Sequence, residues 1–173
     1  MLDISENEFR DYLFNNHKDD FCSLIVGRRE PVEWGGEEFP PLHFLLQRKV
    51  ERAINEILDQ LEELVLTAKE LRLDKAGPYP TRVDLFGCSE STGITIVELK
   101  KSRQTERQAF TELLAYANHF CSIFPGVNET AITSVLVAPM ETRTVKDAYV
   151  QELLLNKKIL SHLFRLVNMD VIL

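Results

Sequence analysis

The chain has 173 residues, of which 45% are hydrophobic and 27% charged, a composition that indicates one folded domain rather than a disordered chain. No apolar run approaches the ~20 residues that span a bilayer, and the N-terminus lacks the pattern of a signal peptide, so we expect no membrane association. The three widely spaced cysteines argue against a disulfide framework and favour a cytoplasmic protein. The net charge of −7 argues against a broad, nonspecific nucleic-acid-binding surface but is compatible with local binding.

The N-terminal part predicts a helix followed by a loop. A helix is expected over residues 4–15, with Ser5 as its N-cap and apolar residues at helical spacing. The short apolar run at 21–26 is typical of a strand. Prolines and glycines interrupt residues 28–41, so we expect a surface loop there, with Trp34 folded onto the body.

The middle of the chain predicts a long helix and then strands. Residues 42–61 form an amphipathic helix whose apolar residues recur at three- and four-residue steps. Its apolar stripe consists of Leu46, Val50, Ala53, Ile54, Ile57, Leu58 and Leu61. Three strands are then expected at 63–73, 81–88 and 93–99, with turns at 77–80 and 89–93.

The remainder predicts a helix at 104–124 ended by Pro125–Gly126, a buried strand at 131–138, a helix at 145–155, and a final strand at 169–173. The fold class is therefore α/β, with a mixed central sheet flanked by helices. We expect a single domain, made of an N-terminal extension (1–41), a core (42–139) and a C-terminal helix and tail (140–173). Its apolar ending favours a domain excised from a longer protein.

Charged residues interrupt two of the expected strands. Asp84 lies inside the apolar run 82–87, and Glu98 and Lys100 lie in the run 94–100. Since side chains alternate along a strand, Glu98 and Lys100 face the same side of the sheet. A hairpin between the two strands brings Asp84 to the same patch.

Two carboxylates and an ammonium in apolar strands need compensation, because buried charge is costly unless it is paired or bound to metal. Carboxylate oxygens suit Mg²⁺ or Mn²⁺. Such an ion can lower the pKa of a bound water and stabilise charge on a phosphate, and a neighbouring lysine can orient that water. The alternative is a salt-bridged hairpin at a sheet edge, with Lys100 and Lys101 solvated.

The two runs, Arg82-Val83-Asp84-Leu85-Phe86 and Ile94-Thr95-Ile96-Val97-Glu98-Leu99-Lys100, resemble the core signature of the PD-(D/E)XK nuclease superfamily, which has a restriction-endonuclease-like fold. The resemblance implies that Asp84 and Glu98 bind the metal, with the Leu99 carbonyl as a further ligand. It also implies that Lys100 orients the attacking water.

The resemblance extends over residues 42–139, where the order α-β-β-β-α-β matches the core of that superfamily. The proline of the family's name is absent, because Val83 precedes the aspartate, a departure that many members share. Family members often carry a further acid on the helix before the first strand. At about 100° per residue, Glu51 lies roughly 60° from a stripe centred on Ile54, whereas Glu56 lies roughly 160° away, so Glu51 is the better candidate ligand.

Related nucleases also place a glutamine and a tyrosine on the helix after the E-x-K strand. Here Glu112 stands where that glutamine would sit, Tyr116 is in place, and Gln108 lies one turn earlier as a substitute. Basic residues beside the site suit contacts with phosphates, although a solvated helix start explains them equally well. These residues are Lys101, Arg103 and Arg107.

The resemblance implies a Mg²⁺-dependent nuclease that acts on DNA, with RNA as the other substrate class, in phage defence or DNA repair. A homodimer or a larger complex is expected from the same likeness. One alternative is a noncatalytic module of the same fold that binds nucleic acid or protein, which the low basic content favours. Another is an enzyme that acts on an unrelated phosphate-containing substrate.

Overall fold

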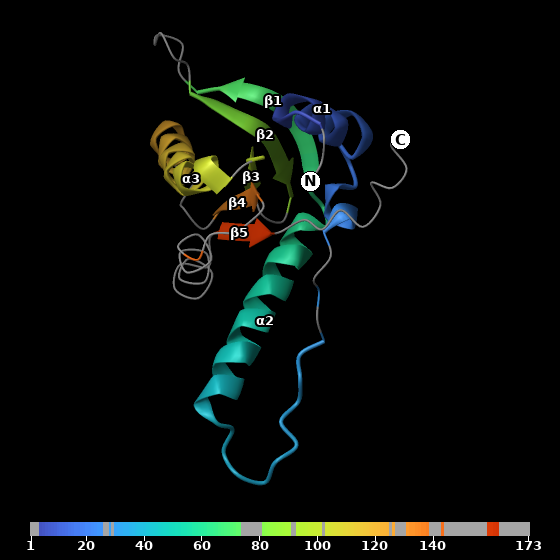
Figure 1. Ribbon diagram of the computed structural model, residues 1–173, viewed down its shortest axis with the longest axis vertical. Helices are drawn as coiled ribbons and strands as arrows, with labels where there is room; N and C mark the ends of the chain where they lie inside the picture. The colour runs from blue at the N-terminus through green and yellow to red at the C-terminus, as the bar shows by residue number, and fades with distance from the viewer. Residues whose placement is uncertain are drawn as a thin grey trace.

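The computed structural model describes residues 4–25, 28, 30–73, 81–90, 93–101, 103–124, 126, 131–138, 143 and 159–162. For residues 103–107 and 159–162 it describes the backbone alone. The described residues form three α-helices, one 3-10 helix and five strands (Figure 1). The helices are α1 (Glu6–Asn16), η1 (Phe21–Leu24), α2 (Leu42–Leu61) and α3 (Arg103–Ile123). The strands are β1 (Val65–Arg72), β2 (Arg82–Ser89), β3 (Gly93–Leu99), β4 (Ile132–Val137) and β5 (Ile159–His162).

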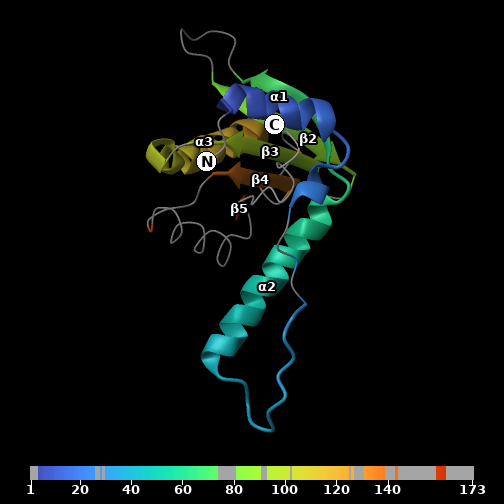
Figure 2. The same ribbon diagram turned by 45° about the vertical axis from the view of Figure 1, so that its right-hand side comes forward.

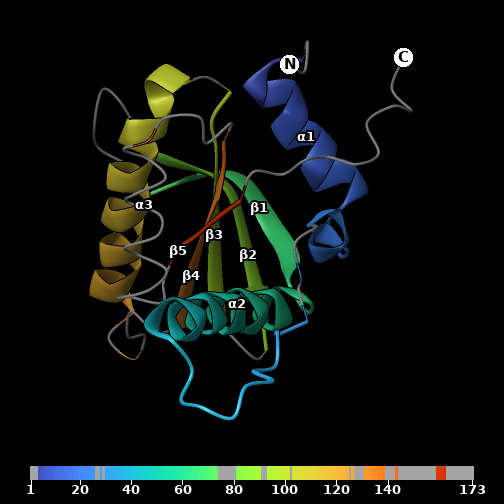
Figure 3. The ribbon, with the colours of Figure 1, turned by 60° about the horizontal axis from the view of Figure 1, so that its bottom comes forward.

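The strands form one mixed sheet in the order β1-β2-β3-β4-β5. The β1–β2 and β2–β3 pairs are antiparallel, whereas the β3–β4 and β4–β5 pairs are parallel. In Figure 3, α3 lies beside one face of this sheet and α1 beside the other, while α2 crosses one end of the strands. The expected mixed sheet flanked by helices, in the order α-β-β-β-α-β, is confirmed.

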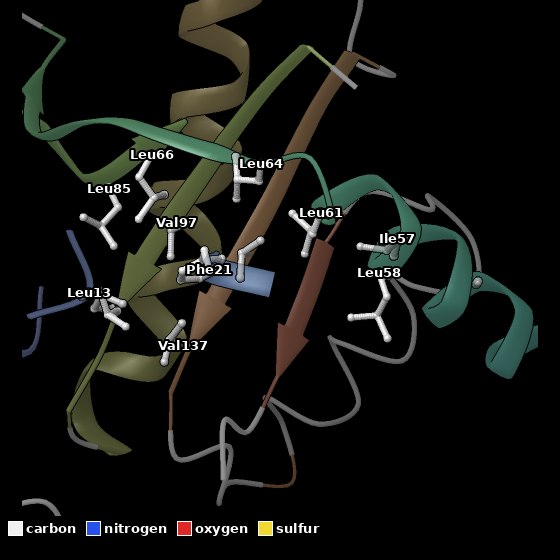
Figure 4. Close-up of a cluster of buried hydrophobic side chains, with 13 residues drawn as sticks. Leu13, Phe21, Ile57, Leu58, Leu61, Leu64, Leu66, Leu85, Val97 and Val137 are labelled. Carbon is white, nitrogen blue, oxygen red and sulfur yellow. The ribbon is translucent and has the colours of Figure 1, made fainter. Parts of the chain in front are cut away.

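Each face of the sheet packs its own hydrophobic cluster, because successive side chains of a strand point in opposite directions. On β3, Ile96 belongs to the cluster beneath α3, whereas Val97 and Leu99 belong to the cluster on the opposite face. That second cluster also takes side chains from α1, η1 and the end of α2 (Figure 4). The central strand β3 is therefore covered on both sides.

The N-terminal helix is confirmed, together with its cap. The Ser5 hydroxyl accepts a hydrogen bond from the Glu8 backbone N–H, and the Glu8 carboxylate accepts one from the Ser5 N–H, so two otherwise unpaired donors are satisfied. The strand expected at 21–26 is wrong, because residues 21–24 form η1. Its backbone N–H groups bond three residues back, as in the Ser23 N–H to Asp20 carbonyl bond, instead of joining the sheet.

Helix α2 has the expected bounds, but only its second half joins the core. Its buried residues all come after position 50, and no residue between 30 and 50 is buried. In Figures 1 and 2 the first half of α2 and the preceding loop project away from the sheet. The Trp34 ring packs against Phe44 in this projecting half, so its expected place on the body is wrong.

The predicted β1 to β4 strands and α3 are confirmed to within two residues at each end. The fifth strand, β5, was not expected from the sequence; it pairs in parallel with β4 over Ile159–His162. The turn expected at 77–80, the helix at 145–155 and the strand at 169–173 lie outside the described residues. Within the described part of the chain, no helix is both long enough and apolar enough to cross a membrane.

Gly93 opens β3 with a positive φ of 82°, and a Cβ built there would lie 2.8 Å from the backbone oxygen of Ala131. We predict that Gly93→Ala destabilises the protein by roughly 1 to 3 kcal/mol, because it adds both backbone strain and a backbone clash. Urea unfolding measures the change. Gly35→Ala is the matched control, since nothing lies within 4 Å of its added Cβ; equal losses in the two variants would contradict the prediction.

Candidate active site

The candidate site lies where the β2 and β3 backbones stop pairing. Their last paired residues are Leu85 and Val97, and no further pair joins Asp84 to β3. Instead, the Asp84 carboxylate accepts a hydrogen bond from the Leu99 backbone N–H at 2.9 Å. A side chain thus continues the contact between the strands, and this places the Asp84 carboxylate beside the end of β3.

On β3, Glu98 and Lys100 face α3, as their two-residue spacing predicts. The Lys100 ammonium lies 2.5 Å from Glu98 Oε1 and 2.9 Å from Glu112 Oε2. Glu112 is in turn held by Gln108, whose Nε2 donates to Glu112 Oε1 at 2.8 Å. The expected auxiliary residues Gln108 and Glu112 therefore form a chain of polar contacts that ends on Lys100.

Glu98 is a buried acid whose negative charge is only partly compensated. Burial, and after it the charge of Asp84, raise the pKa of its carboxyl to about 9, and the contact with Lys100 only partly opposes them. The second oxygen, Oε2, is buried and has no hydrogen-bond partner among the described residues. Burial likewise raises the pKa of Asp84, although the Leu99 N–H lowers it.

These acids also shift the pKa of two other side chains. Burial lowers the pKa of Lys100, but its contacts with Glu98 and Glu112 outweigh burial and raise this pKa above its ordinary value. Lys100 therefore remains an ammonium and donates hydrogen bonds. Tyr116 is buried on α3, and both burial and the charge of Glu98 raise the pKa of its phenol.

Sequence analysis missed Arg10 of α1, whose side chain is only 9% exposed. Its guanidinium lies 3.8 Å from Asp84 Oδ1 and 3.3 Å from Glu70 Oε1, and it donates to Asn7 Oδ1 at 3.1 Å. Glu70 has a positive φ of 50°, an unusual backbone conformation for a non-glycine residue. Arg10 therefore joins α1 to the β1–β2 edge of the site.

The same helix contributes Glu6, whose charge acts on Asp84 and raises the pKa of that carboxyl. Its Oε2 accepts a hydrogen bond from the Lys101 backbone N–H at 3.1 Å. A signal was present in the sequence, because Arg10 lies about 60° from the buried Leu13 around the helix and Glu6 lies one turn before Arg10. The geometry that separates Glu51 from Glu56 thus places these two residues on the buried side of α1, although it does not name their partners.

Helical geometry predicted the burial of the α2 acids correctly, since Glu51 is 7% exposed and Glu56 is exposed. The hydrogen bond described for Glu51 comes from Gln47, at 2.8 Å, and none of the described contacts joins Glu51 to Asp84 or Glu98. Lys101 is exposed beside the site. The side chains of Arg103 and Arg107 lie outside the described part of α3.

The donor set suits a divalent cation that prefers oxygen. Asp84 and Glu98 are two partly to fully buried carboxylates, and the unpartnered Glu98 Oε2 is an oxygen that such an ion could bind. Among the described residues, no group of three or more histidine, cysteine, aspartate or glutamate side chains is close enough to hold a metal. The remaining ligands would therefore be a backbone carbonyl, such as that of Leu99, and water.

The paired acids on β2 and β3, followed by α3 and the parallel β4, complete the arrangement expected from the sequence. The element order and the mixed sheet match the restriction-endonuclease-like core that the sequence predicts. No protein-family model matches the sequence, and no curated protein matches it.

Solved structures similar to this chain include an EndoMS–double-stranded DNA complex and a repair endonuclease from Pyrococcus abyssi. The EndoMS match has 19% identity and a TM-score of 0.40 over 76% of this chain and 48% of the other. The repair endonuclease match has 20% identity and a TM-score of 0.36 over 68% and 46%. SfsA from Pyrococcus furiosus with Ca²⁺ has 14% identity and a TM-score of 0.34 over 68% and 55%. This chain thus spans about half the length of each.

The raised pKa of Glu98 predicts how stability depends on pH in the absence of metal. Between the ordinary carboxyl pKa of 4.5 and about 9, the unfolded chain binds fewer protons than the folded one, so stability falls as pH rises. The raised pKa of Asp84 acts in the same direction. We predict that Glu98→Gln makes the decline between pH 5 and 8 shallower, by at most about 1.4 kcal/mol per pH unit.

Urea unfolding in a chelator, repeated across that pH range, tests this prediction. Glu112→Gln is not a clean control because Glu112 contacts Lys100, so Glu90→Gln, an exposed position at the end of β2, serves instead. An unchanged slope in Glu98→Gln would show that Glu98 is ionised in the folded protein.

Arg10 is predicted to stabilise the junction of α1 with the sheet. Arg10→Met keeps the apolar stem but removes the buried cation beside Asp84, while Glu70 keeps only its exposed pair with Arg82, so we expect a loss of about 2 to 4 kcal/mol in the free energy of unfolding. Arg28→Met is the matched control, since Arg28 pairs with acids too but is exposed, and we expect a much smaller loss. Equal losses would refute a special role for Arg10.

Proposed function

We propose that this chain is a metal-dependent nuclease that hydrolyses phosphodiester bonds of nucleic acid, with DNA as the substrate of first choice. One observation carries the proposal: Asp84, Glu98 and Lys100 meet where β2 and β3 separate, and a buried oxygen of Glu98 there has no hydrogen-bond partner in the part of the chain that the structure describes. Buried acids without compensation are costly, so an arrangement of this kind indicates a bound cation.

In this proposal Asp84, Glu98 and the Leu99 carbonyl hold Mg²⁺ or Mn²⁺. When bound, such an ion lowers the pKa of a coordinated water and stabilises the charge that develops on a phosphate. Lys100 orients the attacking water through hydrogen bonds that it donates as an ammonium. Its contacts with Glu98 and Glu112 hold the lysine in that position.

The surrounding residues support these roles. Gln108 donates a hydrogen bond to Glu112, and Glu112 pairs with Lys100. Glu112, which stands where related nucleases have a glutamine, therefore positions the lysine. Tyr116 closes the α3 side of the site as a buried neutral phenol. The basic residues proposed to contact phosphates are Lys101, Arg103 and Arg107.

Two residues are candidates for a further acid that acts on the site by its charge, since no three acidic side chains of the described residues lie close enough together to hold a metal. Glu51 is the choice from the sequence, but its described partner is Gln47. Glu6 acts electrostatically on Asp84 and bonds to the backbone of Lys101, next to Lys100. We therefore place Glu6 ahead of Glu51 as the further acid.

We predict that Asp84→Asn and Lys100→Met each lower cleavage by on the order of a hundredfold or more, because each removes a charge that acts on the reacting phosphate or water. The assay uses single-stranded, duplex and branched DNA and RNA, with Mg²⁺ and with Mn²⁺. Controls are Asp59→Asn and Lys18→Met, exposed residues that we expect to leave cleavage unchanged. Full cleavage by both site variants would overturn the proposed function.

A noncatalytic module of the same fold is the second candidate, favoured by the net charge of −7. Calorimetry with Mg²⁺ separates the two when it is combined with the cleavage assay. Heat of binding that disappears in Asp84→Asn, without cleavage of any substrate by the unmodified protein, would support the module. Binding together with cleavage supports the enzyme.

A further inference from the structure

A projecting arm, formed by the loop 30–41 and the first part of α2 (Leu42–Val50), exposes more apolar side chain than the rest of the described surface. Five of the nine large hydrophobic residues that are exposed in the described chain belong to it. They are Val32, Trp34, Phe39, Leu42 and Leu46, and Phe39 and Leu42 are 84% and 71% exposed. Large contiguous apolar patches on a protein surface usually mark an interaction site.

The arm's uncovered stripe continues the apolar face that α2 buries in the core. Val50 packs against the core cluster, and Leu46 and Leu42 follow at four-residue steps along the same face. The loop does not cover them, because it packs on another side of the helix. There the Trp34 and Phe44 rings lie 5.1 Å apart, and Arg48 pairs with Glu33 at 3.3 Å.

The charges beside this stripe differ at its two ends. Glu37 and Glu38, both exposed, precede the helix, whereas the exposed Lys49 lies about 60° from Leu46 near the other end of the uncovered stripe. Two such helices that pack antiparallel bring the lysine of one beside the glutamates of the other, whereas parallel packing opposes like charges. The described residues from 30 to 50 hold four glutamates against Arg48 and Lys49, a balance that disfavours a nucleic acid at this surface.

We propose that the arm is a self-association surface for a second copy of this chain. In the resulting dimer, the stripe of Leu42 and Leu46, together with Phe39 just before the helix, packs against the same residues of the second copy, with the two α2 helices antiparallel. In a dimer with two-fold symmetry, the same patch of both copies forms the interface, so each arm covers the arm of the other copy. The unequal charges at the ends of the stripe fix the antiparallel direction.

Sedimentation velocity and light scattering of the full chain over a range of concentrations test the proposal. The expected result is a dimer that Leu42→Glu combined with Leu46→Glu converts to a monomer, while circular dichroism and urea unfolding show an intact fold. Leu114→Glu, at a 53% exposed position on α3, is the matched control and should remain a dimer. A chain that is monomeric at every concentration would overturn the proposal. This outcome includes a monomer whose stripe is covered by another segment of the same chain.

A charge-reversal series tests the antiparallel direction and also decides the matter if the double variant fails to fold. Lys49→Glu should weaken the dimer, because it opposes Glu37 and Glu38 of the second copy. Adding Glu37→Lys and Glu38→Lys to that variant should restore the dimer. A dimer that is insensitive to Lys49→Glu and persists in the Leu42 and Leu46 variant would mean that another surface pairs the chains.

Discussion

Beyond the Leu85–Val97 pair, β2 and β3 separate, and the Leu99 N–H would lose its partner there if Asp84 did not accept its hydrogen bond. A backbone donor that is buried without a partner costs roughly 1 to 3 kcal/mol. Asp84 meets this need and at the same time brings a negative charge next to Glu98. The same hydrogen bond therefore satisfies a backbone donor of the sheet and places a carboxylate in the candidate site.

The site around that bond contains more acid than base at close range. Lys100 serves both Glu98 and Glu112, and Arg10 serves Asp84 and Glu70 from the other side of the sheet. Each cation is thus shared among acids, since Arg10 also lies 3.7 Å from Asp11. Burial and the charge of Asp84 keep the pKa of Glu98 high despite a lysine in direct contact with it. The cations hold the acidic side chains in place but do not neutralise all of their negative charge. A bound divalent ion would neutralise the remainder.

Much of this arrangement follows from periodicity over short stretches of sequence. The two-residue step places Glu98 and Lys100 on one face, the turn after β2 returns β3 beside Asp84, and the helical step places Gln108 and Glu112 on one edge of α3. The roles of Glu6 and Arg10 depend on contacts between distant segments, which no local pattern specifies. The strand expected at 21–26 was wrong for a related reason: a short apolar run does not show whether a sheet edge is available to it.

Helix α1 also links the beginning of the chain to its middle, since 95 residues separate Glu6 from Lys101 at their hydrogen bond. Contacts over such a sequence separation form slowly, because a long loop must close before they contribute any stability. The β2–β3 hairpin, in contrast, closes over a few residues. A nascent or partly folded chain can thus hold Asp84 and Glu98 side by side while Arg10 and Glu6 are still absent, so the complete charge cluster forms only once the whole domain has folded.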